Sequence, residues 1–388
     1  MKTVQTQLDS TSPGASADED IREQMWRRLP RWLQPWLTEV TGKAATHETA
    51  PWRWTWWSRL AVALVWLTLS TLASGWLVEQ SPPWWLLIPL PWLVATSVMQ
   101  TLQTNFLHHA SHGNLSGKQR FDQLISEALS VLILYRPFAA YQPDHLLHHG
   151  RLGLVDDVDL QFIVRLGFVP GMSRHFYWGQ FWRTIFSPGF HGRWILSRLR
   201  ANFVTASPLR RAAAVAYSGG LVLIATWVGA WTLLLAWLVP IFVLLQISLF
   251  LQLVTEHTWV RRPDKNVRAS IASLTYDRYF GEPLPRNNAA YGWTVWWLRF
   301  AFIHLPSRML VAPGDLANHS WHHRHPLARA LWPNAAYARR DDLTSGHQGW
   351  PAYTEIWGVR AMFNATFDAL GGLPRDATLG QPETYNKL

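Results

Sequence analysis

The amino-acid sequence predicts an all-α integral membrane protein with four transmembrane helices in two hairpins and a cytoplasmic helical cap. Two long gaps in positive charge support this prediction: Lys and Arg are absent between Arg59 and Lys118, and again between Arg211 and Arg261. Each gap holds far more apolar residues than the ~20 that cross a bilayer once. Roughly 45 helical residues extend for about 70 Å, which suits two crossings of ~30 Å each.

The breaks within the gaps divide each into two spans. The first gap is interrupted by "EQSPPWW" at Glu79–Trp85, and the second has softer breaks around Gly229 or Pro240. We therefore expect spans at about 59–79, 84–106, 212–234 and 236–257. The cap would comprise residues 107–211 and 258–388, so that residues 59–388 form one membrane domain.

The distribution of charge predicts the orientation of the chain. The formal net charge is +10, and the positive residues lie between the predicted hairpins and on both tails. By the positive-inside rule, both termini and the cap are cytoplasmic, and we expect a bacterial inner membrane. The basic, aromatic stretch at 160–211 could also indicate single-stranded nucleic acid. Next to four spans, anionic membrane lipid is the better interpretation, and we expect no nucleic-acid partner.

The N-terminal region has two predicted parts. Residues 1–20 are polar and lack the apolar core of a signal peptide, so we expect a disordered tail. Residues 21–58 begin with "IREQMWRRLPRWLQPWLTEVTG", which mixes Trp and Leu with Arg. This composition predicts an interfacial amphipathic segment, with two short helices divided at Pro30 or Pro35. Another amphipathic candidate lies at 291–305.

Histidines form the chemical pattern of the chain. The motif H-x-x-H-H occurs twice, in "DHLLHHGRLG" (144–153) and in "NHSWHHRHP" (318–326). A third cluster is "FLHHASHG" (106–113), and His257 follows the fourth predicted span. Histidines at i, i+3 and i+4 share one helix face, so each cluster can direct two or three rings to one point. The chain has no Cys, which excludes thiolate-bound zinc and iron–sulfur clusters.

All these clusters fall on the same predicted side of the membrane at a similar depth. Nine histidines could therefore enclose a common centre: His108, His112, His145, His148, His149, His257, His319, His322 and His323. Because one metal takes roughly four to six ligands, nine imply two metals. We expect His109 and His325 to be neighbours of this centre. The other histidines, His47, His175, His191, His304 and His347, are better explained as ordinary packed or hydrogen-bonded residues.

Carboxylates near the ligands are candidates for orienting the rings through their second nitrogen. They are Asp144, Glu256, Asp156, Asp157 and Asp159. Ordinary solvated loop charges explain the run at 156–159 equally well.

H-x-x-x-H followed by two H-x-x-H-H motifs, on four spans, resembles the integral-membrane fatty acid desaturase superfamily over roughly residues 55–330. The resemblance implies two iron ions, held by His108 and His112, by the two triplets at 145–149 and 319–323, and by His257. It implies O₂ as co-substrate and no catalytic residues beyond the metal ligands. Some members carry an Asn one helical turn before the histidine that ends the fourth span, here His257. In this chain that position is Leu253, and Gln252 is near but out of register.

The resemblance implies an oxidation of an unactivated C–H bond in a fatty acid or acyl lipid, with desaturation as the first expectation. Hydroxylation of a lipid or hydrocarbon, or oxidative decarboxylation to a terminal alkene, stays open. No haem-binding or Cys-containing redox domain is evident, so we expect an external donor, a ferredoxin or a cytochrome with its reductase. A non-catalytic metal transporter or sensor is disfavoured, because the spans hold almost no ionisable residues.

Overall fold

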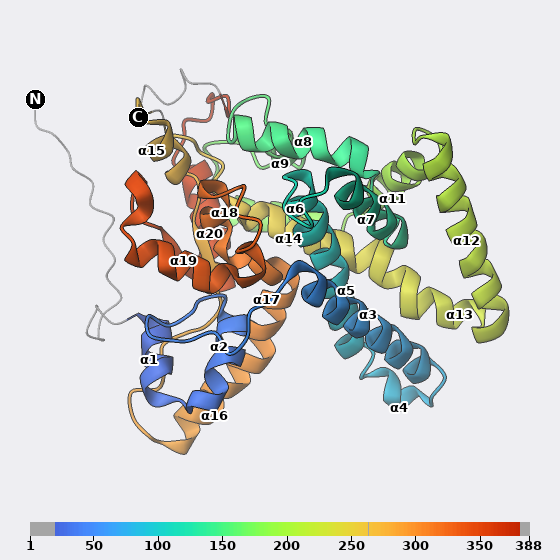
Figure 1. Ribbon diagram of the computed structural model, residues 1–388, viewed down its shortest axis with the longest axis horizontal. Coiled ribbons are helices and arrows are strands. Elements are labelled where there is room, and N and C mark those ends of the chain that lie inside the picture. Colours follow the sequence, from blue (N-terminus) through green and yellow to red (C-terminus); the bar gives the residue numbers. More distant parts are fainter. Residues whose placement is uncertain (1–19, 263, 381–388) are drawn as a thin grey trace, which may run out of the picture.

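The computed structural model describes residues 20–262 and 264–380, and this part of the chain is mostly helical (Figure 1). The predicted disorder of residues 1–20 lies outside the described residues, except for Asp20. The Asp20 side chain accepts a hydrogen bond from the backbone N–H of Arg22 (2.8 Å) and so caps the first helix.

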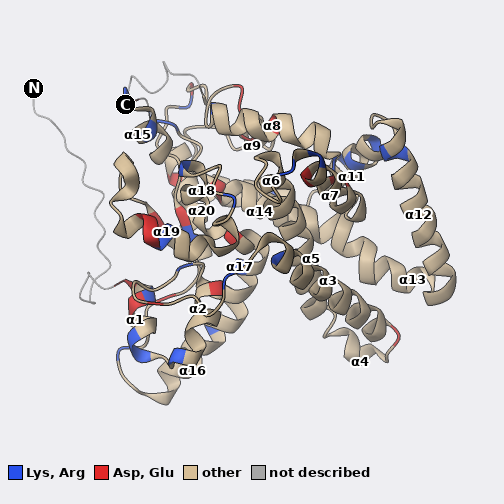
Figure 2. Cartoon of the chain, in the orientation of Figure 1, with Lys and Arg blue, Asp and Glu red and all other residues tan. Residues whose placement is uncertain are grey.

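Four helices are long and apolar enough to cross a membrane, as predicted. They cover Trp56–Val78, Pro82–Ser111, Pro208–Val228 and Ala230–Glu256. The third ends earlier than expected, because Gly229 adopts φ 86°, a left-handed conformation that glycine tolerates. Figure 2 shows that these helices carry almost no charge along their length.

The spans are built from α-helical and π-helical segments. The first is α3 (Trp56–Val78) and the third is α12 (Pro208–Val228). The second runs through α4 (Pro82–Trp85), α5 (Pro89–Thr101), η2 (Leu102–Leu107) and α6 (His108–Ser111). The fourth runs through α13 (Ala230–Leu233), η3 (Leu234–Leu238), η4 (Pro240–Leu244) and α14 (Leu245–Glu256). The segments η2, η3 and η4 are π-helical.

The outer parts of the spans project away from the rest of the chain (Figure 1). In Figure 1, α3 and α4 extend to one side, as do α12 and α13. Helix α3 packs along α5, and α14 packs against α5 and α17. The second and fourth spans thus bridge the membrane part and the cap, and both end where the histidines lie. The division into two hairpins and the cytoplasmic position of the cap stay predictions.

The cap consists of short helices from two stretches of chain. The first holds α7 (Gln119–Leu132), α8 (Phe138–Arg151), α9 (Val158–Arg165), α10 (Arg174–Ile185) and α11 (Pro188–Phe203). The second holds α15 (Val267–Ala272), α16 (Ala290–Arg299), η5 (Phe300–His304), α17 (Leu305–Val311), η6 (Gly314–Asn318), α18 (His319–Arg324), η7 (Trp332–Asn334), α19 (Ala335–Thr344), η8 (His347–Gly349) and α20 (Val359–Gly371).

The all-α prediction missed one small sheet. Strand β1 (Asp277–Tyr279) pairs in parallel with β2 (Glu355–Trp357), with Asp277 opposite Glu355. Arg339 bridges the two strands, since its Nε lies 2.9 Å from Asp277 and its Nη2 lies 2.6 Å from Glu355. Strands of three residues are too short to show an alternating pattern in sequence, which explains why they were not predicted.

The N-terminal segment forms α1 (Ile21–Arg28), η1 (Arg31–Leu33) and α2 (Gln34–Thr41), with the break at Pro30. These helices pack against the predicted amphipathic stretch, where α16, η5 and α17 follow one another from Ala290 to Val311. Trp296 and Phe300 are buried against Met25 and Leu37. An interfacial position of this lobe stays a prediction.

Candidate metal centre

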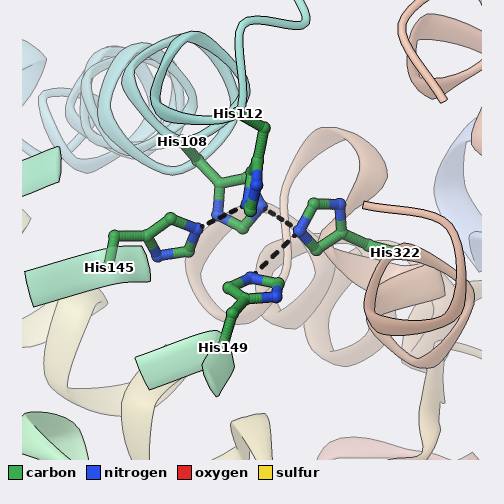
Figure 3. A group of neighbouring side chains, drawn as sticks. All are labelled: His108, His112, His145, His149 and His322. Atoms are coloured by element: carbon green, nitrogen blue, oxygen red, sulfur yellow. Dashed lines mark hydrogen bonds between the residues drawn. The ribbon is translucent and has the colours of Figure 1, made fainter. Parts of the chain in front are cut away.

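The structure brings all nine predicted histidines together, in two adjacent groups. His108, His112, His145, His149 and His322 form the first, and His148, His257, His319 and His323 form the second. Within each group the donor nitrogens lie within 4.8 Å of one another. We name them the five-histidine group, shown in Figure 3, and the four-histidine group.

Each H-x-x-H-H motif is divided between the groups. In α8, His145 and His149 join the five-histidine group and His148 joins the other; in α18, His319 and His323 join the four-histidine group, with His322 in the other. In each motif, the histidines at positions i and i+4 lie one turn apart on one face and contribute to the same group. The histidine at position i+3 contributes to the adjacent group. The single common face assumed from sequence is thus too simple.

In both groups the ring nitrogens point toward one another. In the five-histidine group, Nε2 of His322 lies 2.7 Å from Nε2 of His108 and 3.2 Å from Nε2 of His149 (Figure 3). Nε2 of His112 lies 2.9 Å from Nε2 of His145. A neutral imidazole has one lone-pair nitrogen and one N–H, so such convergence of nitrogens is what a shared metal ion requires.

The four-histidine group is more deeply buried. Nε2 of His257 lies 3.3 Å from Nε2 of His148, and Nε2 of His323 lies 3.0 Å from Nε2 of His319. His257 is fully buried, and its Nδ1 has no hydrogen-bond partner among the described residues. The chain leaves the helical conformation at His257, where the backbone pairs with Thr275 and Thr366 donates a hydrogen bond to the His257 carbonyl (3.0 Å).

The electrostatics of the cap histidines favour the neutral form, which binds metals. Burial and the neighbouring imidazoles lower the pKa of His149, His322 and His323 well below the usual value. His148 is the exception. Burial alone lowers its pKa, but the charge and hydrogen bond of Asp157 outweigh this and raise the pKa to about 10.

Three of the five predicted carboxylates contact the histidines. Asp157 is fully buried, with Oδ1 2.9 Å from Nδ1 of His148, and Asp159 lies 3.5 Å from the same nitrogen. Glu256 lies 3.0 Å from Nε2 of His319. Asp157 therefore holds one ring nitrogen of His148 and leaves the other directed at His257.

The remaining two carboxylates are occupied elsewhere. Asp144 pairs with Arg136 (2.5 Å) and Asp156 pairs with Arg151 (2.9 Å), both on the partly exposed outer side. In the described structure neither forms an ion pair with a histidine of the two groups. Asp156 thus agrees with the alternative that the sequence left open for the run at 156–159, an ordinary solvated loop charge.

The sequence did not reveal the contact between His109 and Asp315. Nε2 of His109 lies 2.7 Å from Oδ2 of Asp315, and Asn105 donates to the other oxygen of that carboxylate. The His109 ring also stacks on Trp332, with centroids 4.3 Å apart. His109 thus lies outside both groups, and its role as a neighbour instead of a ligand stays a prediction. The one available signal was the position of Asp315, four residues before His319.

The other histidines also lie outside the two groups. Nε2 of His325 lies 3.2 Å from Asp342, and His191 contacts the Ile185 carbonyl (2.7 Å). Leu253, at the position where some relatives of the proposed family carry Asn, packs in an apolar cluster with Phe250 and Trp259. That position contributes no polar group here.

Comparison with known proteins agrees with this architecture. No curated protein matches the chain. Residues 82–357 match the family model described as "Fatty acid desaturase", and this range contains both H-x-x-H-H motifs, the first cluster and His257. A match over most of the chain, together with four membrane-capable helices and the clustered histidines, shows that this chain belongs to the fatty acid desaturase family.

Proposed function

We propose that the protein is a membrane-bound, O₂-dependent di-iron enzyme that oxidises an unactivated C–H bond of a fatty acyl chain, with desaturation as the reaction. The observation that carries this proposal is the presence of two adjacent all-imidazole groups of five and four histidines in a chain of this family. Imidazole suits iron as a ligand, and the absence of Cys leaves no competing thiolate donors.

The nine histidines fit two metal ions. Their converging Nε2 atoms are the donors that a bound ion would satisfy. When bound, the two irons would supply the activation of O₂ and the removal of hydrogen from the substrate. The protein's own contribution is to hold the rings: Asp157 fixes His148, and Glu256 lies against His319. A carboxylate on the ring nitrogen opposite the converging one, as Asp157 is on Nδ1 of His148, sets the tautomer and orientation of a ligand ring. Glu256 instead contacts Nε2 of His319, the nitrogen that also lies close to His323.

The substrate we propose is a fatty acid or acyl lipid that enters from the membrane. The second and fourth apolar spans end at the histidine groups, so a chain lying in the bilayer needs to travel only a short way to them. Each buried methylene contributes ~0.8 kcal/mol, so the chain would supply most of the affinity. We also propose a cytoplasmic metal centre, in a bacterial inner membrane, and an external ferredoxin or cytochrome with its reductase as electron donor.

The test combines metal analysis with product analysis. The purified protein should contain close to two irons per chain. With O₂, a ferredoxin–reductase pair and a labelled series of C12 to C18 acids, it should produce an internal alkene detectable by mass spectrometry. An alcohol as the sole product would show that the reaction is hydroxylation and not desaturation, and a terminal alkene as the sole product would show that it is oxidative decarboxylation. One zinc and no iron would contradict the proposal as a whole.

The control variants follow from the geometry. His322→Ala removes a nitrogen that lies close to both His108 and His149, so we expect loss of activity and of metal. His325→Ala changes a histidine in the same helical region that lies outside both groups, and should keep much of the activity. Multiple turnovers without any added reductant would contradict the proposed external donor.

A further inference from the structure

A cavity of about 320 Å³ lies outside the histidine groups, among α2, α3, α5, α17 and the start of α19. This volume is within the range of small-molecule sites. Apolar side chains form much of its wall: Val62, Ala63, Val98, Leu305 and Met309. Val62 is 40 % exposed on the first span, whereas Ala63 is buried. The cavity therefore extends from the outer surface of a membrane-capable helix into the protein.

Arg308 lines this cavity and is the unusual group in it. Its side chain is only 6 % exposed. Nε donates a hydrogen bond to the Glu39 carbonyl (3.0 Å), and Nη2 donates to the Gly314 carbonyl (2.6 Å). Nη1 is buried and has no hydrogen-bond partner among the described residues. One N–H donor group of this buried guanidinium therefore lacks an acceptor among the described residues, and a bound ligand would supply one.

The other charged groups of the cavity already have partners. Both carboxylate oxygens of Glu39 accept hydrogen bonds from Arg59, at 2.7 and 3.1 Å. Asp315 is held by His109 and Asn105. Within residues 20–262 and 264–380, no carboxylate lies at ion-pair distance from Arg308. Burial lowers the pKa of Arg308 to about 10, so the side chain is still charged at neutral pH.

A buried cation that only neutral carbonyls contact is costly, and an anion beside it removes much of the cost. Guanidinium matches carboxylate and phosphate oxygens in geometry and charge. We propose that this cavity binds the anionic head group of a membrane amphiphile, a carboxylate or a phosphate, through Nη1 of Arg308. The apolar tail lies along Val62, Val98 and Leu305 and continues toward the bilayer.

This site is distinct from the histidine groups. Asn105 and Asp315 form part of its lining, and Asp315 also holds His109, which belongs to neither group. Binding in the cavity requires no metal ion and no turnover. The proposal therefore holds or fails independently of the oxidation proposed above.

The test measures binding to the full-length protein in detergent without reductant. Tritiated hexadecanoate, hexadecyl phosphate and hexadecanol have the same tail and differ in the head. We expect saturable binding of at least one anionic amphiphile, and binding of the alcohol weaker by roughly 10- to 100-fold, the value of one charge-assisted hydrogen bond. The preferred anion distinguishes a fatty acid from a phospholipid head. This comparison measures the preference for an anionic head without any substitution, and because a fatty acid is also the proposed substrate at the histidine groups, the variants below assign the bound anion to the cavity.

Variants then locate the site. Arg308→Gln should weaken binding of the preferred anion to the level of hexadecanol, and Arg308→Lys should retain part of it. The matched control is Arg198→Gln. Arg198 is also buried, and its guanidinium donates hydrogen bonds to the backbone carbonyls of Ile133, Leu134 and Ile241, but it does not line the cavity. We expect this control to bind as the unmodified protein does. Equal affinity for acid, phosphate and alcohol, or unchanged binding in Arg308→Gln, would overturn the proposal.

Discussion

His148 and His149 are adjacent in sequence but belong to different histidine groups. Nε2 of His148 lies 3.3 Å from His257, whereas Nε2 of His149 lies 3.2 Å from His322, and the two ring planes are inclined at 88°. Helix α18 shows the same division with the roles exchanged, since His322 and His323 also separate. The repeated motif thus lets two helices each contribute to two groups.

This division predicts that single substitutions remove the metals unequally. His148→Ala leaves three histidines in its group, while His149→Ala leaves four in the other. We expect His148→Ala to lose about one of two irons, and His149→Ala to lose less at the same free iron concentration. Metal analysis by mass spectrometry tests this, with His325→Ala as the control. Loss of both irons from either variant would mean that the groups are not separate sites.

Asp157 should matter for metal affinity although it belongs to neither the five-histidine nor the four-histidine group. Asp157→Asn keeps the size of the side chain but removes the charge beside Nδ1 of His148. Loss of such an orienting carboxylate costs about 10- to 100-fold in metal affinity. Asp156→Asn, next to it, changes a partly exposed group paired with Arg151 and is the control. Chelator competition measures both, and equal effects would contradict this role.

His109 offers a test of the ligand assignment within the first cluster. Its Nε2 is held by Asp315 and its ring stacks on Trp332. His109→Phe keeps an aromatic ring against Trp332, so we expect iron content close to that of the unmodified protein. His108→Phe, at the adjacent position, should lose metal. Equal loss in both variants would show that His109 is a ligand.

Trp259 should stabilise the end of the fourth span. It is fully buried, lies 5.1 Å from the His257 ring and packs with Phe250 and Val254. Trp259→Ala should lower the free energy of unfolding by ~3–5 kcal/mol, because a large buried ring is removed. Trp227→Ala changes a side chain that is 89 % exposed on α12, and should change stability by about 0.5 kcal/mol or less. Thermal unfolding of both variants in the same detergent tests this, and a similar decrease in Tm for the two variants would contradict the prediction.

The spans and the nine histidines could be predicted because each depends on local sequence. Charge-free apolar runs mark the spans, and helical spacing identifies the histidines that share a turn. The division of each motif between two groups could not be predicted, since it depends on how α8 and α18 face each other. Likewise, Asp315 meets His109 across a sequence distance of about two hundred residues, and no local pattern encodes such a contact.

The π-helical segment η2 immediately precedes the first histidine cluster. A π-bulge amounts to one extra residue in an α-helix. If the same residues Leu102–Leu107 were wound as regular α-helix, the extra residue would no longer be absorbed, and everything beyond it would turn by ~100° relative to the span. His108 and His112 would then face away from His145 and His322. The rotation of the second span about its own axis therefore determines the direction in which its histidines point. This cluster cannot be transferred to another protein without the membrane helix that carries it.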